Sequence, residues 1–385
     1  MALRLASVIL WQGPEQCARK MIIFVRLNRE GMKEKVICGL QQVGVGVKDA
    51  RESWKWYRKY FGIDIPVVDA VGVAERMLPY TGGKPQPRYA ILAVNLQGGG
   101  GLEIWEPRGR ELNYPPQQPQ LGDLGTFIAK IKSRDVQATY DFFQREGLRL
   151  LNKPCTSFAG LQHFYLFDPW DNIYEIEEDP FVFARSKTVT TGGTGGAVLG
   201  VSDMDRSIAF YGQVLGFDVV RADKTGVFED MKGIPGGERK VRRVLLERSK
   251  PFEGPLSPLM GPAHLELVQA FDMPVVKIYE NRYWGDPGYI QICFDVRNME
   301  AVERDCQAAG HPFVCDSGVD FAMGDADGHF TYIEDPDGTL IEFVETFRIP
   351  IMKKWGIYLD FRKRDDHKPL PAWMLKALRF LRAND

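Results

Sequence analysis

Residues 42–62 of this chain read QVGVGVKDARESWKWYRKYFG, and this stretch decides the fold. Ser53, Tyr57 and Gly62 follow Asp49 by 4, 8 and 13 residues. Positions four residues apart share one face of an α-helix. Aspartate suits the residue that caps a helix start, and glycine suits the left-handed turn that ends one. The stretch therefore predicts a strand, then a capped helix with one buried face.

The same pattern recurs three more times along the chain. Residues 200–217, GVSDMDRSIAFYGQVLGF, repeat it with identical spacing from Asp203. A second form, with offsets of 4, 8 and 12 residues, starts at Asp135 and again at Asn298. The order along the chain is therefore A, B, A′, B′, and a repeat of this kind dictates the architecture.

Each repeat opens with a strand-like run and continues, after its helix, into β-rich segments. The four opening runs are residues 40–47, 126–132, 197–201 and 289–296. Their alternation of apolar and polar residues is incomplete, as expected for strands buried on both faces. The unit is β-α-β-β-β, and the chain is expected to have an α+β fold of four such modules.

Composition shifts predict how the modules are divided. Residues 188–196, TVTTGGTGG, have the composition of a flexible linker. The expected units are an N-terminal extension (1–37), a first domain of two modules (38–187), the Gly/Thr linker (188–196), a second domain of two modules (197–347) and a C-terminal tail with a helix (348–385). Met21 and Met32 both precede the first repeat and are alternative natural starts. The apolar face of the tail helix is expected to dock on the body, with a homodimer contact as the alternative.

Composition excludes several classes of protein. The chain has 385 residues, 44% apolar and 26% charged, with a net charge of −2, and no basic stripe argues for a nucleic-acid partner. No apolar run approaches the roughly 18 residues that a membrane span needs. The six cysteines form no CxxC pair, which predicts reduced thiols in a cytoplasmic protein.

Residues 164–178, FYLFDPWDNIYEIEE, and 332–345, YIEDPDGTLIEFVE, complete a family resemblance with the two stretches quoted above. Together they resemble the vicinal oxygen chelate superfamily, which contains glyoxalase I, extradiol dioxygenases and bleomycin resistance proteins. The Asp-Pro-Asp-Gly turn followed by Ile-Glu-Phe is the most specific signal. The resemblance covers residues 38–346. It implies modules paired into two curved-sheet, glyoxalase-like domains, each enclosing a cavity that usually holds a divalent metal.

The resemblance also implies metal ligands on the first and last strand of each module. These positions are Gln42, Glu103, Phe127 and Glu175 in the first half, and Gly196, Glu266, Gln291 and Glu342 in the second. Each half thus offers two glutamates, one glutamine and one residue that cannot bind a metal. Such oxygen ligands favour manganese, magnesium or calcium, with zinc or iron as alternatives.

The ligand set points to a reaction type. An extradiol dioxygenase needs two histidines and a carboxylate on iron, but the matching positions of the second half are Gly196 and Gln291. The resemblance to glyoxalase I is closer. We therefore expect an isomerase or lyase that moves a proton next to a metal-bound carbonyl of a small oxygenated substrate. The alternatives are a metal-free small-molecule binding protein of the resistance type and a ring-cleaving dioxygenase with atypical ligands.

Histidines single out the second half as the expected catalytic centre. His264 lies two residues before Glu266, so both side chains point to the same face of one strand. We expect Glu266, Gln291 and Glu342 to hold the metal, with His264 as the fourth ligand or the base. His329 and His163 precede the two Asp-Pro turns and are expected to face the substrate pocket. The first half is then a second site or a structural copy.

Overall fold

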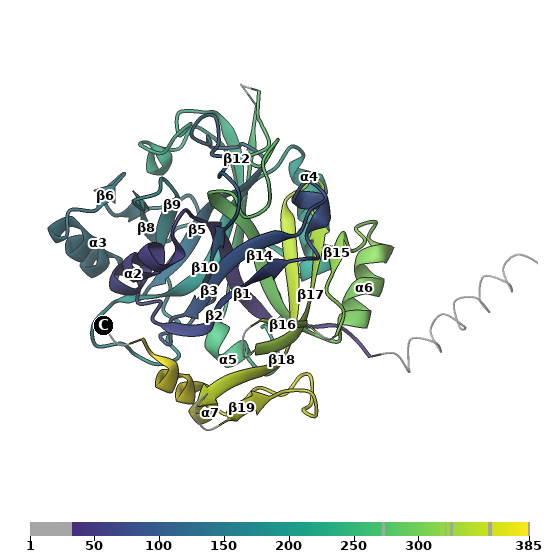
Figure 1. Ribbon diagram of the computed structural model, residues 1–385. Helices are drawn as coiled ribbons and strands as arrows, with labels where there is room; N and C mark the ends of the chain where they lie inside the picture. Colours follow the sequence, from purple (N-terminus) through teal and green to yellow (C-terminus); the bar gives the residue numbers. More distant parts are fainter. Residues whose placement is uncertain (1–32, 272–273, 320, 324–325, 353–355, 384–385) are drawn as a thin grey trace, which may run out of the picture.

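The computed structural model describes residues 33–271, 274–319, 321–323, 326–352 and 356–383. Most of the expected N-terminal extension, with Met21 and Met32, lies outside the described residues. The described chain is a mixed α+β structure in which helices flank two curved sheets (Figure 1). The predicted fold class is confirmed.

The elements repeat the order strand, helix, strands four times. Module 1 contains β1 (Val36–Gly46), α2 (Ala50–Phe61), β2 (Ile65–Ala74), η1 (Leu78–Tyr80), β3 (Gln86–Val94) and β4 (Gly101–Pro107). Module 2 contains β5 (Gly125–Ser133), α3 (Val136–Arg145), β6 (Arg149–Leu150), β7 (Cys155–Thr156), β8 (Gln162–Phe167) and β9 (Ile173–Glu178). Module 3 contains β10 (Thr191–Gly200), α4 (Met204–Leu215), β11 (Val219–Gly226), η2 (Glu229–Met231), β12 (Val241–Glu247), α5 (Ser257–Met260) and β13 (His264–Ala270). Module 4 contains β14 (Gly288–Arg297), α6 (Met299–Ala308), β15 (Cys315–Asp316), β16 (Phe321–Met323), β17 (Ala326–Glu334) and β18 (Leu340–Met352).

All four predicted helix starts are confirmed, and the expected side-chain cap is present at three of them. Asp49 accepts a hydrogen bond from the backbone N–H of the third residue after it, at 2.9 Å, and Asp135 and Asp203 do the same. Asn298 differs, because its backbone is left-handed and its side chain caps nothing. There the carboxylate of Glu345 on β18 accepts from the Asn298 N–H at 3.0 Å, so a neighbouring strand supplies the cap.

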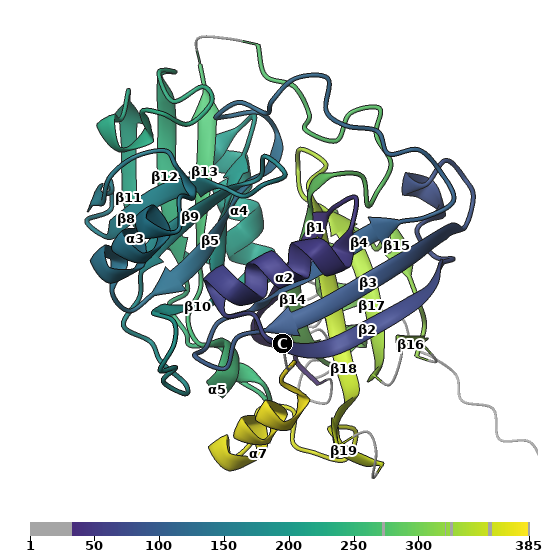
Figure 2. The same ribbon diagram turned by 60° about the vertical axis from the view of Figure 1, so that its left-hand side comes forward.

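Each of the two sheets combines one module from the first half of the chain with one module from the second half. Sheet A has the order β15-β17-β18-β14-β1-β4-β3-β2 and joins modules 1 and 4. Sheet B has the order β11-β12-β13-β10-β5-β9-β8-β6 and joins modules 2 and 3. Figure 2 shows the two sheets side by side. The expected pairing of modules within residues 38–187 and within residues 197–347 is therefore wrong.

Close backbone contacts explain the pairing that is found. A Cβ atom on Gly46, at the end of β1, would lie 2.1 Å from the carbonyl oxygen of Asp286, just before β14. A Cβ atom on Gly200, at the end of β10, would lie 1.8 Å from the carbonyl oxygen of Asp123, just before β5. Glycine at position 46 lets β1 approach the segment before its paired strand β14, and glycine at position 200 lets β10 approach the segment before its paired strand β5.

The expected linker is largely a buried strand. Within residues 188–196, the run from Thr191 onward belongs to β10, which pairs with β5 and with β13. A Cβ atom on Gly193 would lie 2.1 Å from the carbonyl oxygen of Gly100, and one on Gly196 would lie 2.0 Å from that of His264. These glycines permit close packing of neighbouring backbones. A composition that is typical of a flexible linker therefore forms a buried strand here.

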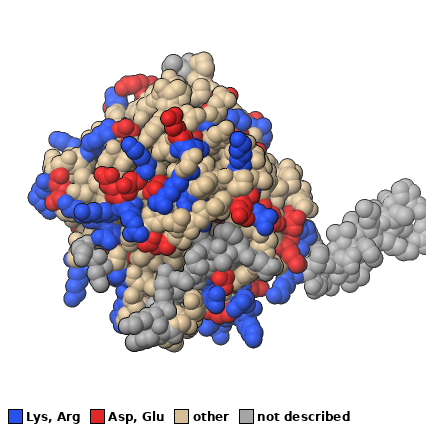
Figure 3. All heavy atoms as spheres, in the orientation of Figure 1, with Lys and Arg blue, Asp and Glu red and all other residues tan. Residues whose placement is uncertain are grey.

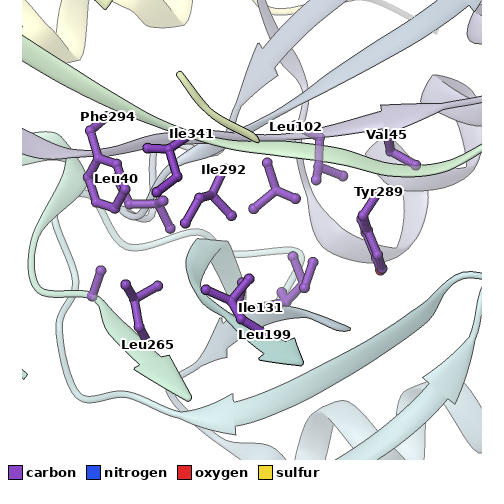
Figure 4. Close-up of a cluster of buried hydrophobic side chains, with 14 of the residues drawn as sticks. Leu40, Val45, Leu102, Ile131, Leu199, Leu265, Tyr289, Ile292, Phe294 and Ile341 are labelled. Atoms are coloured by element: carbon purple, nitrogen blue, oxygen red, sulfur yellow. The ribbon is translucent and has the colours of Figure 1, made fainter. Parts of the chain in front are cut away.

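The main core lies between the two sheets. Figure 4 shows Leu40 and Ile292 of sheet A facing Ile131, Leu199 and Leu265 of sheet B. All five are buried and belong to one continuous cluster. Because side chains alternate along a strand, the residues of β1 between its core positions point to the opposite, concave face of sheet A.

Two helices, α2 and α4, are each linked to an Asp-Pro turn by a tyrosine hydrogen bond. Tyr57 on α2 donates a hydrogen bond to Asp168 at 2.7 Å, and Tyr211 on α4 donates to Asp335 at 2.8 Å. Both tyrosines are fully buried in the core. Module 1 is therefore joined to module 2, and module 3 to module 4, by a contact between a helix and a turn. The strands of the two joined modules belong to different sheets in each case.

The C-terminal tail forms β19 (Ile357–Asp360), α7 (Ala372–Lys376) and η4 (Ala377–Leu381). Leu375 and Leu378 are buried in a cluster with Ile65 of β2 and Met260 of α5, whereas Trp373 is 71% exposed. The tail therefore docks on the body with only part of the apolar face that was expected to do so.

The surface and the cysteines add two observations. On the face drawn in Figure 3, acidic and basic residues are interspersed. Each of the five cysteines in the described part of the chain is free. No described helix is long and apolar enough to cross a membrane.

Candidate metal centre

Four polar residues meet on the concave face of sheet A, and we call them the Gln/Glu site. They are Gln42 on β1, Glu103 on β4, Gln291 on β14 and Glu342 on β18, which come from four adjacent strands. Glu103 and Gln291 both stand opposite Gly44, while Gln42 and Glu342 both stand opposite Cys293. The sheet register therefore places two residues from module 1 and two from module 4 around one point.

The side chains of the Gln/Glu site contact one another directly. The amide nitrogen of Gln42 donates to Glu103 and to Glu342, at 3.2 Å each. The amide nitrogen of Gln291 donates to Glu103 at 2.9 Å and to Glu342 at 3.5 Å. Gly44 leaves the necessary room, because a Cβ atom there would lie 2.6 Å from the Gln291 amide. The two carboxylates thus share the same two donors.

Burial shapes the electrostatics of this site. Glu103 and Glu342 are both buried on the concave face. Burial, followed by the charge of Glu342, raises the pKa of Glu103. Burial likewise raises the pKa of Glu342, although hydrogen bonds from the neighbouring side chains, including both glutamines, oppose this. Two carboxylates held together in this way are costly when both are ionised, unless a cation joins them.

A cavity of about 500 Å³ opens beside the Gln/Glu site. Gln42, Glu103 and Glu342 form part of its wall, together with the aromatic rings of Trp105 and Trp284. Aliphatic side chains from β2, β3, α5 and β18 line much of the remainder. The cavity therefore brings a mainly apolar space into contact with a small polar group, as is typical of small-molecule sites.

The donor set of the Gln/Glu site fits a hard divalent cation. The amide oxygens of Gln42 and Gln291 are buried and have no hydrogen-bond donor. A side-chain amide can present either its oxygen or its nitrogen to a neighbour, so each glutamine can offer an oxygen beside the two carboxylates. In the described residues, no group of three or more His, Cys, Asp or Glu side chains could hold a metal, so the amides are essential to this site.

The corresponding region of sheet B is filled by the protein's own cations, and we call it the lysine cluster. Its centre is Lys130 on β5, whose ammonium group lies 2.7 Å from Glu175, 2.8 Å from Glu177 and 3.1 Å from Glu266. Arg243 on β12 adds a second contact to Glu266 at 2.7 Å. All five residues are buried.

In the lysine cluster, the pKa shifts of Lys130, Glu177 and Glu266 all favour the charged form of the group. Burial would raise the pKa of Glu177 and of Glu266, but the adjacent cations outweigh it and lower both. Burial would lower the pKa of Lys130, but the three glutamates outweigh it and hold the pKa well above its usual range. The charged forms of Lys130, Glu177 and Glu266 are therefore favoured. Because Glu175 and Glu266 both contact the Lys130 ammonium group, neither is free to bind a metal.

The expected catalytic set of the second half is wrong. Glu266 lies on β13 of sheet B, whereas Gln291 and Glu342 lie on sheet A. Glu266 therefore cannot share a metal with them. The expectation was wrong because the modules of one half contribute to different sheets.

His264 is also separate from the Gln/Glu site. Its imidazole pairs with Glu177 at 3.0 Å and with Glu247 at 3.5 Å, on the edge of a different cavity. The expected role of His264 as a fourth ligand or base beside Gln291 and Glu342 is therefore wrong.

The two expected pocket histidines differ in their positions. His329 lines the cavity beside the Gln/Glu site and pairs with Asp316 at 2.7 Å. His163 instead lies in sheet B, fully buried, with its ring 2.6 Å from Glu175. The expectation of a pocket residue is therefore wrong for His163, which belongs with the lysine cluster.

Three important residues were missed by the sequence reasoning. Lys130, Arg243 and Arg88 are buried cations in otherwise apolar strands. Lys130 stands in the middle of the strand-like run 126–132, and Arg243 and Arg88 occupy similar runs. A basic residue inside a buried strand is unusual enough to have signalled an ion pair or a ligand.

Comparison with known proteins supports the fold. Residues 194–343 match the family model described as the Glyoxalase/Bleomycin resistance protein/Dioxygenase superfamily. This span contains nearly all of modules 3 and 4. Modules 1 and 2 repeat the same pattern of elements. No curated protein matches the chain.

Several solved structures are similar to the chain. Glyoxalase I from Zea mays is 16% identical, with 81% of this chain and 92% of that chain covered and a TM-score of 0.49. A putative dioxygenase from Bacillus subtilis is 13% identical, with 82% and 86% covered and a TM-score of 0.49. A Mn(II)-bound glyoxalase from Novosphingobium aromaticivorans is 14% identical, with 88% and 89% covered and a TM-score of 0.28.

Proposed function

Because the chain belongs to the glyoxalase/bleomycin resistance protein/dioxygenase superfamily, we propose that it is a divalent-metal-dependent enzyme acting on a small oxygenated molecule. Its catalytic centre is the Gln/Glu site. One observation carries the proposal: Gln42, Glu103, Gln291 and Glu342 converge from four strands on one point beside a cavity of about 500 Å³.

The four residues of the Gln/Glu site would hold the cation. Carboxylate and amide oxygens are hard ligands, which favour Mn²⁺, Mg²⁺ or Ca²⁺ over Zn²⁺ or iron. These four residues would place such a cation where it would supply Lewis-acid polarisation of a substrate carbonyl oxygen. None of the four residues is a histidine, which favours this chemistry over that of a ring-cleaving iron dioxygenase.

The chain's own side chains supply the remaining requirements for proton transfer. Burial raises the pKa of Glu103 and of Glu342 while no cation is bound, and we assign the uptake of the substrate proton to one of these two carboxylates. The glutamine amides hold both carboxylates in place by hydrogen bonds. The apolar wall of the cavity limits water around the reacting carbon. These properties favour an isomerase or lyase that moves a proton next to a carbonyl group.

Titration with Mn²⁺ tests the proposal. We expect the purified protein to bind one Mn²⁺ per chain, as followed by calorimetry and by the electron paramagnetic resonance of free Mn²⁺. Glu103→Gln and Glu342→Gln should each weaken binding by about 100-fold, because each removes a charged ligand. The matched control is Glu106→Gln, on the same strand as Glu103 but with its carboxylate on the Ala50 N–H and Arg108.

The outcomes separate the alternatives. Unchanged Mn²⁺ affinity in both ligand variants contradicts the assignment of the site. A protein that stays metal-free after dialysis against manganese, magnesium, zinc and iron is a metal-free binding protein. Iron that copurifies and supports oxygen uptake identifies a dioxygenase with unusual ligands.

A further inference from the structure

The cavity beside the Gln/Glu site contains a buried arginine that pairs with no carboxylate among the described residues. We propose that Arg88, on β3, determines substrate specificity by binding a carboxylate group, so that the substrate is an organic monoacid with an apolar body. This inference rests on the proposed function, because it assigns a substrate class to the same cavity. It does not depend on which metal is bound.

The contacts of Arg88 leave much of its hydrogen-bonding capacity unused. Arg88 is only 5% exposed and lines the cavity. One terminal nitrogen donates to the carbonyl oxygen of Ala70 at 2.9 Å, while the Nε–H group is buried without an acceptor. The guanidinium group lies 5.0 Å from the centre of the Trp105 ring. Within the described chain, Arg88 forms no ion pair with a carboxylate.

Such an arrangement is costly unless a ligand completes it. A buried guanidinium group without a counter-ion loses its hydration and gains no ionic partner. Burial accordingly lowers the pKa of Arg88, and the charge of Glu103 only partly opposes this. The hydrogen bonds of Glu103 go to the two glutamines, and Glu103 forms no direct ion pair with Arg88.

Arg243 in sheet B shows how the same protein treats a buried arginine that has only a structural role. Arg243 has no exposed surface, and its guanidinium group contacts Glu266 and Asp230 at 2.7 Å each. Two aromatic rings, those of Phe158 and Phe228, cover it. Arg243 therefore has two carboxylates where Arg88 has none. The missing carboxylate at Arg88 is the one that a ligand would supply.

Charge and shape select a monoanion with an apolar body. Of the other basic residues that line the cavity, Arg76 is exposed to solvent and His329 is paired with Asp316. Glu103 and Glu342 line the same wall, and the proposed cation would offset their charge. Arg88 is then the one basic side chain of the described inner wall without a carboxylate partner, which matches one carboxylate and not a doubly charged phosphate. The planar guanidinium fork also fits the planar carboxylate group.

The neighbouring wall agrees with this choice. The indole N–H groups of Trp105 and Trp284 are buried without acceptors, so hydrogen-bond donors are in excess here. The two rings are packed edge to face, with their centres 4.3 Å apart. They provide an apolar surface for the body of the acid beside the arginine that binds its charge.

Binding of two matched probes tests the inference on the unaltered protein. We expect 3-phenylpropanoate to bind at least about tenfold more tightly than the neutral 3-phenylpropanamide, because only the acid pairs with the guanidinium group. Calorimetry in the presence and absence of Mn²⁺ provides the measurement, which requires no turnover. Equal affinities, no binding of the carboxylate, or tighter binding of 2-phenylethylphosphonate as its dianion would each overturn the inference.

Variants then assign the preference to Arg88. Arg88→Met should remove the preference for the acid and leave the affinity for the amide and for Mn²⁺ unchanged, whereas Arg88→Lys should keep part of the preference. The control is Arg108→Met, because Arg108 stacks on Tyr89 in a similar way but is paired with Glu106.

The variants also separate this inference from the proposed function. An acid preference that persists in Arg88→Met overturns the role of Arg88. Should that variant not fold, Arg88→Lys and the two probes on the unaltered protein decide. If Glu342→Gln loses Mn²⁺ binding but keeps the preference for the acid, the role of Arg88 is independent of the metal site.

Discussion

Sheet A and sheet B follow the same plan but treat their centres in opposite ways. In each, the first and last strands of two modules lie side by side, and a glutamate stands on both last strands. In sheet A the first strands contribute Gln42 and Gln291, and the two carboxylates share neutral donors. In sheet B the carboxylates surround the ammonium group of Lys130.

This comparison indicates that the residue types on the first strands determine whether the glutamates are available to bind a cation. Glutamates on the last strands are common to both sheets, so they do not by themselves identify a metal site. In sheet B an internal ammonium group neutralises the glutamates, so they cannot bind a metal ion. In sheet A the neutral amides leave the negative charge of the glutamates uncompensated, so a cation can bind. The residues that differ lie on equivalent strands but not at equivalent positions, because Lys130 stands opposite Glu175 as Cys293, and not Gln291, stands opposite Glu342. Single substitutions on the first strands are nevertheless expected to shift each site toward the other.

The largest effect is expected from removing the internal cation of sheet B. Lys130→Met leaves Glu175, Glu177 and Glu266 buried together, and should lower the free energy of unfolding by about 3–5 kcal/mol, as for other broken buried ion pairs. Chemical denaturation followed by circular dichroism measures this. Lys59→Met is the control, because Lys59 pairs with Glu146 on the surface, where the loss of an ion pair should cost far less than in the core. Equal losses in the two variants would contradict the central role of Lys130.

The converse change should close the site of sheet A. Gln291→Lys introduces an ammonium group between Glu103 and Glu342, next to the space that Gly44 leaves. We expect Mn²⁺ affinity to fall by at least about 100-fold, because a resident cation repels a second one. The unfolding free energy should stay the same or rise. Retained Mn²⁺ binding would show that the metal binds elsewhere.

The pH dependence of stability should distinguish the two sheets through His163. Burial would lower the pKa of His163, but hydrogen bonds with Cys155 and Glu175 outweigh it and raise the pKa to about 10. A raised pKa contributes stability that is complete below the unfolded value near 6.5 and is lost as the pH rises through the folded value.

We therefore expect the stability advantage of the unaltered protein over His163→Gln to shrink by roughly 2 kcal/mol between about pH 7 and pH 9. Denaturant unfolding curves at several pH values measure it. An advantage that is constant or grows over this range would show that His163 is neutral in the folded protein.

The smallest effect concerns a feature that the two halves of the chain share. Tyr57→Phe and Tyr211→Phe each remove one hydrogen bond to a buried aspartate, and each should cost about 1–2 kcal/mol. Thermal unfolding of both variants measures the losses. Markedly unequal losses would show that the two halves are not held together in the same way.

The repeat was sufficient to predict the modules but not their partners. Asp49, Asp135 and Asp203 cap helices as their spacing predicts, since capping depends on neighbours within a few residues. Which strand lies beside β1 is a long-range property. It depends on backbone contacts such as that of Gly46 with Asp286, which no periodicity reveals.

The candidate site was predicted residue by residue, but its grouping was not. Gln42, Glu103, Gln291 and Glu342 were all among the expected ligands, because the resemblance to the superfamily marks these positions on the first and last strands of the modules. Glu175 and Glu266 carry the same signal and lie in an ion-pair network. Only the position of Lys130 on the inward face of β5 separates the two cases, and that requires the sheet.

The joining of the first and last modules has a consequence for the order in which the chain can fold during translation. Gln42 and Glu342 are 300 residues apart, so half of the Gln/Glu site leaves the ribosome long before the other half is synthesised. Modules 2 and 3 follow each other directly and can close sheet B first. Until β14 emerges, β1 has an open edge where its antiparallel partner will bind. A nascent chain that stops before β14 therefore carries a complete lysine cluster but only Gln42 and Glu103 of the Gln/Glu site.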